Sequence, residues 1–290
     1  MKVQITHQTL YFYSDAVPLS HNIVRMQPRN TDFQTCLSYE LQLTPTPATR
    51  SEHHDFYKNH VTTFSVQEPH HEMNIVAHSQ VEIQPRPVLE LAQPQTWESA
   101  RQALGSRRDS PTLDALQFTY DSPLAKSIPE LRDYAMDSFS NNSSLFHATL
   151  DLTKRIHRDF RFVPGSTQVG TPVEDVLRMR QGVCQDFAHL QIACMRSIGL
   201  AARYVSGYVI TQPPPGRARL QGADASHAWV GVYFPDVGWI DFDPTNGLVP
   251  FDQHITVAWA RDYDDVCPVK GIIIGGRRQA HRISVDVVPL

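Results

Sequence analysis

Residues 1–90 alternate apolar and polar side chains in several short runs. These runs are Val3–His7, Leu37–Leu43, Val61–Val66 and Ile75–Ile83, with proline and asparagine clusters between them. Successive side chains of a strand point to opposite faces, so such runs are typical of strands with one buried face. Short strands separated by turn residues predict an antiparallel β-sandwich over residues 1–90.

A helical periodicity begins after a proline-containing linker at residues 85–94. Ser110-Pro111 and Ile128-Pro129 place proline in a first helical turn, where its missing N–H is not needed. A further helical face is formed by Leu145, Leu152, Ile156 and Phe160. We therefore predict a helical linker region over residues 91–145 and a core domain over residues 146–290, which includes the C-terminal strands.

The segment that follows Cys184 predicts a buried helix. Its apolar residues cover two faces and are Phe187, Ala188, Leu190, Ile192, Cys194, Met195 and Ile198. A helix that is apolar over most of its circumference belongs in a core. Strands are predicted next at residues 202–210, 226–234 and 239–243, with a proline-rich loop at residues 213–216 after the first of them.

Composition and charge exclude several classes of function. A net charge of −4 and 19% charged residues leave no basic surface for nucleic acid or an anionic membrane. No apolar stretch approaches the ~20 residues of a membrane span, and the N-terminus lacks the apolar core of a signal peptide. We expect a cytoplasmic protein with no nucleic-acid or membrane partner, and its oligomeric state stays open.

The cysteines and histidines do not show metal-ligand spacing. The four cysteines, Cys36, Cys184, Cys194 and Cys267, form no pair or cluster of the zinc-finger type. His53-His54 and His70-His71 are interpreted as strand-edge surface rather than as ligands. The sequence therefore predicts free thiols, no metal and no cofactor.

Cys184 is the candidate nucleophile because it lies at the start of the buried helix. The unpaired N–H groups and the positive dipole end of a helix N-terminus favour thiolate over thiol. Cys194 lies in the middle of the apolar stripe and is interpreted as a core residue. A reactive thiol also requires a base, and the base requires an orienting partner.

His227 and Asp243 are the candidates for base and orienter. Proline cannot donate to a strand ladder, so Pro235 belongs in the connection between the two predicted strands. A loop of about five residues centred on Pro235 sets His227 directly opposite Asp243, with both side chains on one face. Asp241 shares that face and is an alternative orienter. Trp229 either lines the substrate groove or packs in the core, and the same choice applies to Tyr208.

Four segments then show a family resemblance. Gly182–Leu190 resembles the nucleophile motif of bacterial transglutaminase-like proteins, and Gly199–Tyr208 resembles the segment after it. Ser226–Trp229 and Trp239–Asn246 are similar to the histidine and aspartate motifs of these proteins. The N-terminal strands resemble the β domain that precedes the core in many members, so the resemblance covers nearly the whole chain.

The resemblance implies an α+β fold, with a papain-like, transglutaminase-like cysteine core preceded by an antiparallel β-sandwich. It assigns Cys184 as nucleophile, His227 as base and Asp243 as orienter, acting on a peptide or protein amide through a thioester. Hydrolysis, as in a peptidase or amidase, is the expected outcome, and protein cross-linking is an alternative. The backbone N–H of Cys184 is the first candidate oxyanion donor, and Gln181 is a candidate for the second.

A catalytically silent scaffold that serves as an interaction module is the alternative from a different class. The complete set of cysteine, histidine and aspartate argues against it, because a silent scaffold has no chemical reason to keep all three.

Overall fold

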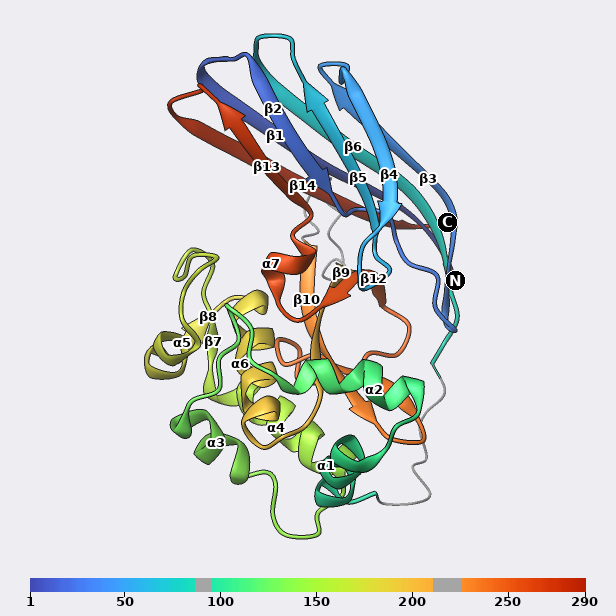
Figure 1. The fold of residues 1–290 in the computed structure, drawn as a ribbon, viewed down its shortest axis with the longest axis vertical. Coiled ribbons are helices and arrows are strands. Elements are labelled where there is room, and N and C mark those ends of the chain that lie inside the picture. The colour runs from blue at the N-terminus through green and yellow to red at the C-terminus, as the bar shows by residue number, and fades with distance from the viewer. Residues whose placement is uncertain (87–94, 211–225) are drawn as a thin grey trace, which may run out of the picture.

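A computed structural model describes residues 1–86, 95–210 and 226–290. Strands form a β-sandwich at one end of the molecule, and helices surround a smaller sheet at the other end (Figure 1). Pro87 and Pro94 of the predicted linker and the proline-rich loop at residues 213–216 lie outside the described residues. Each helix within the described ranges is too short or too polar to cross a lipid bilayer.

The sandwich confirms the strands predicted from alternation. Its N-terminal strands are β1 (Lys2–Val17), β2 (Leu19–Val24), β3 (Gln34–Thr44), β4 (Thr49–His54), β5 (His60–Val66) and β6 (His70–Ile83). Alternate side chains of β1 and β6 are buried, as the period of two predicts. The apolar faces of the two sheets enclose a core that includes Tyr13, Met26, Phe64, Met73 and Ile75.

The last two strands correct the domain division drawn from the sequence. The sequence predicts a core domain over residues 146–290, but β13 (Val269–Ile274) pairs with β2 and β14 (Gln279–Pro289) pairs along β1. The two sheets therefore have the orders β14-β1-β6-β3 and β13-β2-β5-β4. Alternation of apolar and polar residues identifies a strand but not the strand with which it pairs. Position in the chain therefore did not show to which domain β13 and β14 belong. The helical half is an insertion between β6 and β13 of the sandwich (Figure 1).

The described helices of the inserted half are α1 (Trp97–Ser106), α2 (Ser110–Leu116), α3 (Pro129–Met136), α4 (Leu145–Asp159), α5 (Val173–Met179), α6 (Cys184–Ser197) and α7 (Tyr263–Val266), with a short 3₁₀ helix, η1 (Gln117–Thr119). Helices α2 and α3 have the predicted prolines, Pro111 and Pro129, in their first turns. Two short parallel strands, β7 (Arg161–Phe162) and β8 (Gln181–Gly182), lead into α6. Every residue of α6 from Asp186 to Arg196 is buried, which confirms the predicted core helix.

A four-stranded antiparallel sheet supports the other half of the site. It consists of β9 (Ala202–Val209), β10 (Ser226–Phe234), β11 (Gly238–Phe242) and β12 (His254–Ala260), in the order β11-β10-β9-β12. The apolar side chains of this sheet and those of α6 belong to one buried cluster. This shared packing fixes the position of the N-terminus of α6 relative to the sheet.

Side-chain amides of the sandwich cover the outer edge of β12. The Gln34 side chain donates to the carbonyl of Thr256 and accepts from its N–H, both at 2.8 Å. The Asn59 side chain bonds the carbonyl and the N–H of Trp259 in the same way, both at 3.0 Å. An edge strand otherwise leaves such groups unpaired. The sandwich therefore fixes the position of β12 in the core sheet.

Candidate active site

The start of α6 is fixed by a carboxylate one turn into the helix. Asp186 Oδ2 accepts hydrogen bonds from the Val183 N–H at 2.8 Å and from the Thr167 hydroxyl at 2.6 Å. A Cβ on Gly182 would lie 2.8 Å from the same oxygen, so only glycine fits there. Cys184 is the first residue of the helix, and its N–H has no partner within the helix.

The structure brings together the three residues predicted from the sequence. Nε2 of His227 lies 2.8 Å from Oδ2 of Asp243. The Cys184 side chain lies close enough to the same imidazole to raise the pKa of His227. Because Asp243 takes Nε2, the Nδ1 edge is the one that remains for the thiol. The three side chains thus form a line from the N-terminus of a buried helix to a buried carboxylate, with the hydrogen bond between His227 and Asp243 at its inner end.

The strand register differs from the prediction by two residues. We expected His227 opposite Asp243 about a loop centred on Pro235, whereas β10 and β11 pair Gly231 with Asp241 and Phe234 with Gly238. The loop is therefore centred on Asp236, which has a φ of 75°. A shift of two preserves the face to which a side chain points, so His227 and Asp243 still meet.

The electrostatic environment favours a charged pair at the site. Burial lowers the pKa of His227, but its hydrogen bonds to Asp243 and Cys184 and the charges of both outweigh burial and raise the pKa to about 10. Burial likewise opposes ionisation of Asp243, yet the hydrogen bonds from His227 and His254 hold its pKa well below the usual range. The geometry thus stabilises an imidazolium beside a permanently ionised carboxylate.

Asp241, the alternative orienter, faces a different partner. Its Oδ2 accepts from Nη1 of Arg86 at 2.7 Å. Arg203 is buried on the same side and adds a second positive charge near this carboxylate. In this structure Asp241 is an ion-pair residue of the sheet, and Asp243 alone of the two contacts His227.

His254 is the residue of this cluster that the sequence analysis missed. It begins β12, is 5% exposed, and places Nε2 at 2.8 Å from Oδ2 of Asp243, the oxygen that also bonds His227. Asn246 donates to this oxygen at 2.7 Å, and the backbone N–H groups of Thr245 and Asn246 bond Oδ1. No motif or periodicity marks His254, because only the tertiary fold brings the first residue of β12 to Asp243, which follows β11.

His227, Asp243 and His254 also have the composition of a metal site, with ligand atoms that lie within 4.8 Å of one another. Both imidazole nitrogens lie 2.8 Å from one carboxylate oxygen, which is a hydrogen-bond distance. Two imidazole N–H groups that donate to the same oxygen of Asp243 account for both distances. The chemistry of the set is therefore that of an oriented imidazole rather than of a metal ligand sphere.

Several other residues with reactive or aromatic side chains pack in the core. Cys194 is fully buried, and burial raises its pKa to about 12. His189 is also buried and accepts the Tyr263 N–H at Nε2. Trp229 and Tyr208 are 0% and 2% exposed, so both pack in the core rather than line an open groove.

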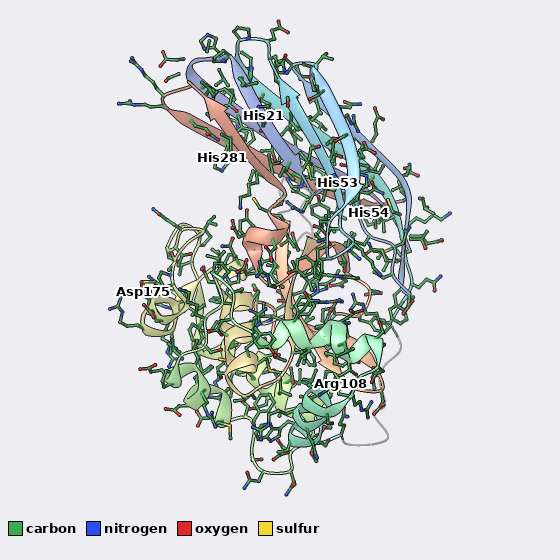
Figure 2. The ribbon with its side chains drawn as sticks, in the orientation of Figure 1. His21, His53, His54, Arg108, Asp175 and His281 are labelled. Atoms are coloured by element: carbon green, nitrogen blue, oxygen red, sulfur yellow. The ribbon has the colours of Figure 1, made fainter. Side chains whose placement is uncertain are left out.

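The histidine pairs of the sandwich are separate from this site. His53 and His54 lie on β4, an edge strand whose six side chains are all exposed (Figure 2). His70 corrects the expectation of a surface pair, because it is 6% exposed and its Nδ1 bonds the carbonyl of Glu68 at 2.7 Å.

Comparison with known proteins identifies the family. The N-terminal strands match the bacterial transglutaminase-like N-terminal region over residues 3–82, and the core matches the transglutaminase-like superfamily over residues 132–244. An uncharacterized protein of Mycobacterium tuberculosis is 42% identical over 296 residues, which cover 99% of this chain and 93% of that protein. An uncharacterized protein of Mycobacterium leprae is 32% identical over 298 residues, which cover 100% of this chain and 99% of that protein. The chain belongs to the transglutaminase-like superfamily.

A solved structure shares the whole architecture. The crystal structure of a candidate cysteine protease from Cytophaga hutchinsonii superimposes with a TM-score of 0.80 and covers 99% of this chain and 90% of that chain. The two sequences are 23% identical, so this likeness concerns the fold. It supports the α+β architecture of a transglutaminase-like core with a β domain.

Proposed function

We propose that this protein is a cysteine-dependent enzyme that cleaves amide bonds of peptides or proteins. The observation that carries the proposal is that His227, hydrogen-bonded to buried Asp243, lies beside Cys184 at the N-terminus of α6. An imidazole held between a thiol and an ionised carboxylate is the arrangement that activates a cysteine nucleophile. A scaffold without chemistry has no need to bury and orient a charge in this way.

The first half-reaction forms a thioester. The Cys184 thiolate attacks the amide carbonyl carbon, and the backbone N–H of Cys184 faces the developing oxyanion as its first donor. The imidazolium of His227 then gives its proton to the nitrogen as the C–N bond breaks, which releases a free amine. The acyl group remains on sulfur, and His227 is left neutral and able to act as a base.

The second half-reaction regenerates the thiol. Neutral His227 takes a proton from water while the water oxygen bonds the acyl carbon and the C–S bond breaks, which yields a carboxylic acid. If an amine takes the place of water, the same steps give transamidation. Hydrolysis is our principal proposal, and transfer to an amine is the alternative outcome of the same site.

A peptide-library screen tests the proposal. The purified chain and its Cys184→Ala variant are incubated with the library, with and without an added primary amine, and the products are identified by mass spectrometry. We expect new carboxyl termini that depend on Cys184, and amine adducts would identify transfer instead. No turnover, together with no selective alkylation of Cys184, would favour the interaction-module alternative.

A further inference from the structure

Two imidazoles from different strands of the core sheet bind the same carboxylate oxygen. His227 is on β10 and His254 is on β12, and β9 lies between these strands. Each ring places Nε2 at 2.8 Å from Oδ2 of Asp243. Besides His227 and His254, the described donors to this carboxylate come from Thr245 and Asn246 in the turn after β11. His254 thus joins the carboxylate to a strand that the other donors do not reach.

The hydrogen bonds determine the tautomer of His254. An ionised carboxylate can only accept, so His254 must donate from Nε2. Among the described residues nothing bonds its Nδ1, which is buried. Burial also lowers the pKa of His254, so the ring remains neutral. A neutral ring with one N–H can support the charge of Asp243 without competing with His227 for the positive charge.

A tryptophan keeps the two rings at a fixed separation. The indole of Trp229 stacks on His227 at a centroid distance of 6.0 Å and meets His254 edge-on at 5.0 Å. Gly207 of β9 provides the space, because a Cβ there would lie 2.6 Å from the Trp229 ring. The two rings are therefore held in place by packing against Trp229 as well as by their hydrogen bonds to Asp243.

We propose that His254 is a positioning residue that holds Asp243 against His227 by donating a second imidazole hydrogen bond to the same oxygen. This inference rests on the proposed function of Cys184. Without the bond from His254, the carboxylate loses its only described contact with β12, and the orientation of His227 toward the thiol is less well defined. The reactivity of the Cys184 thiol should therefore depend on a hydrogen-bond donor at the position that Nε2 of His254 occupies.

Two nearly isosteric variants separate this role from simple packing. In His254→Gln the amide nitrogen is as many bonds from the backbone as Nε2, so it can still donate to Asp243. In His254→Asn the nitrogen is one bond shorter and corresponds to Nδ1, which has no described partner. The measurement is the second-order rate of Cys184 alkylation by iodoacetamide across a pH series, which needs no substrate. Thermal transitions show whether both variants are folded.

We expect His254→Gln to react within about threefold of the wild type and His254→Asn to react about 10-fold more slowly, because a hydrogen bond to a charged group is lost only in the second. His70→Gln and His70→Asn are matched controls at a buried histidine of the sandwich and should leave the rate unchanged. Equal rates for folded Gln and Asn variants of His254 would overturn the inference. If wild-type Cys184 reacts no faster than Cys36, the proposed function itself fails, and the inference fails with it.

Discussion

Replacing Asp243 by Asn tests the electrostatics of the site most directly. Asp243 is 0% exposed, and its Oδ2 lies 2.8 Å from Nε2 of His227. The amide keeps an oxygen near this position but removes the charge that stabilises the imidazolium. A hydrogen bond to a charged group contributes about 1.5–3 kcal/mol, which corresponds to a factor of about 10 to 150. Loss of the buried Coulomb attraction moves the effect toward the upper end, so we expect a decrease in thiolate reactivity of about 100-fold.

The assay is the rate of Cys184 alkylation at neutral pH, and the matched control is Asp241→Asn. Asp241 is also buried and belongs to the same sheet region, but it binds Arg86 rather than His227. An amide at position 243 cannot accept hydrogen bonds on both sides, so some stability is lost and the comparison is restricted to folded protein. The reasoning is refuted if Asp241→Asn slows alkylation as much as Asp243→Asn does.

Three further outcomes are expected. Brief iodoacetamide treatment at mildly acidic pH, followed by mass mapping, should label Cys184 before the other three thiols, and faster labelling of Cys36 would exclude it as nucleophile. Because the pKa of His227 is raised to about 10, the imidazolium persists through neutral pH and is lost as pH rises through that value. Because amide cleavage needs the imidazolium as its acid, the alkaline limb of the pH profile of cleavage should lie near pH 10 and move to lower pH in Asp243→Asn; an unmoved limb would contradict this. Gly207→Ala should destabilise the fold by about 1–3 kcal/mol and slow alkylation, because its methyl group meets Trp229 and the carbonyl of Ile255, whereas Gly105→Ala, with open space around it, serves as the thermal-melt control.

The sequence predicted those parts of the site that depend on local pattern. An apolar helix with a cysteine at its first residue can be read directly from residues 184–198. The shared face of His227 and Asp243 follows from strand parity, which survived the register error at Pro235 because the shift was by two residues. The α+β architecture likewise followed from alternation and helical periodicity, together with the family resemblance.

The parts that could not be predicted depend on contacts distant in the chain. His254 is one of 14 histidines, and nothing near it in sequence indicates that it binds Asp243. The partners of β13 and β14 were missed because a period of two describes any half-buried strand, whichever sheet it joins. Gln34 and Asn59, which cover the edge of β12, have no local signal either, since their role depends on a strand about 200 residues away.

The return of the last two strands to the sandwich affects how the chain can fold during synthesis. Strand β1 pairs on one side with β14, and β2 pairs on one side with β13. Both β13 and β14 are synthesised after the inserted half. The inserted half can therefore complete its own core while the sandwich still has unpaired edges, which are the sites at which nascent chains associate wrongly. A deletion of the last strand should leave β1 exposed along eleven paired positions, from Val3 to Tyr13. Expression of the helical half alone requires that β1–β6 and β13–β14 are omitted together, because each of the two sandwich sheets contains strands from both segments.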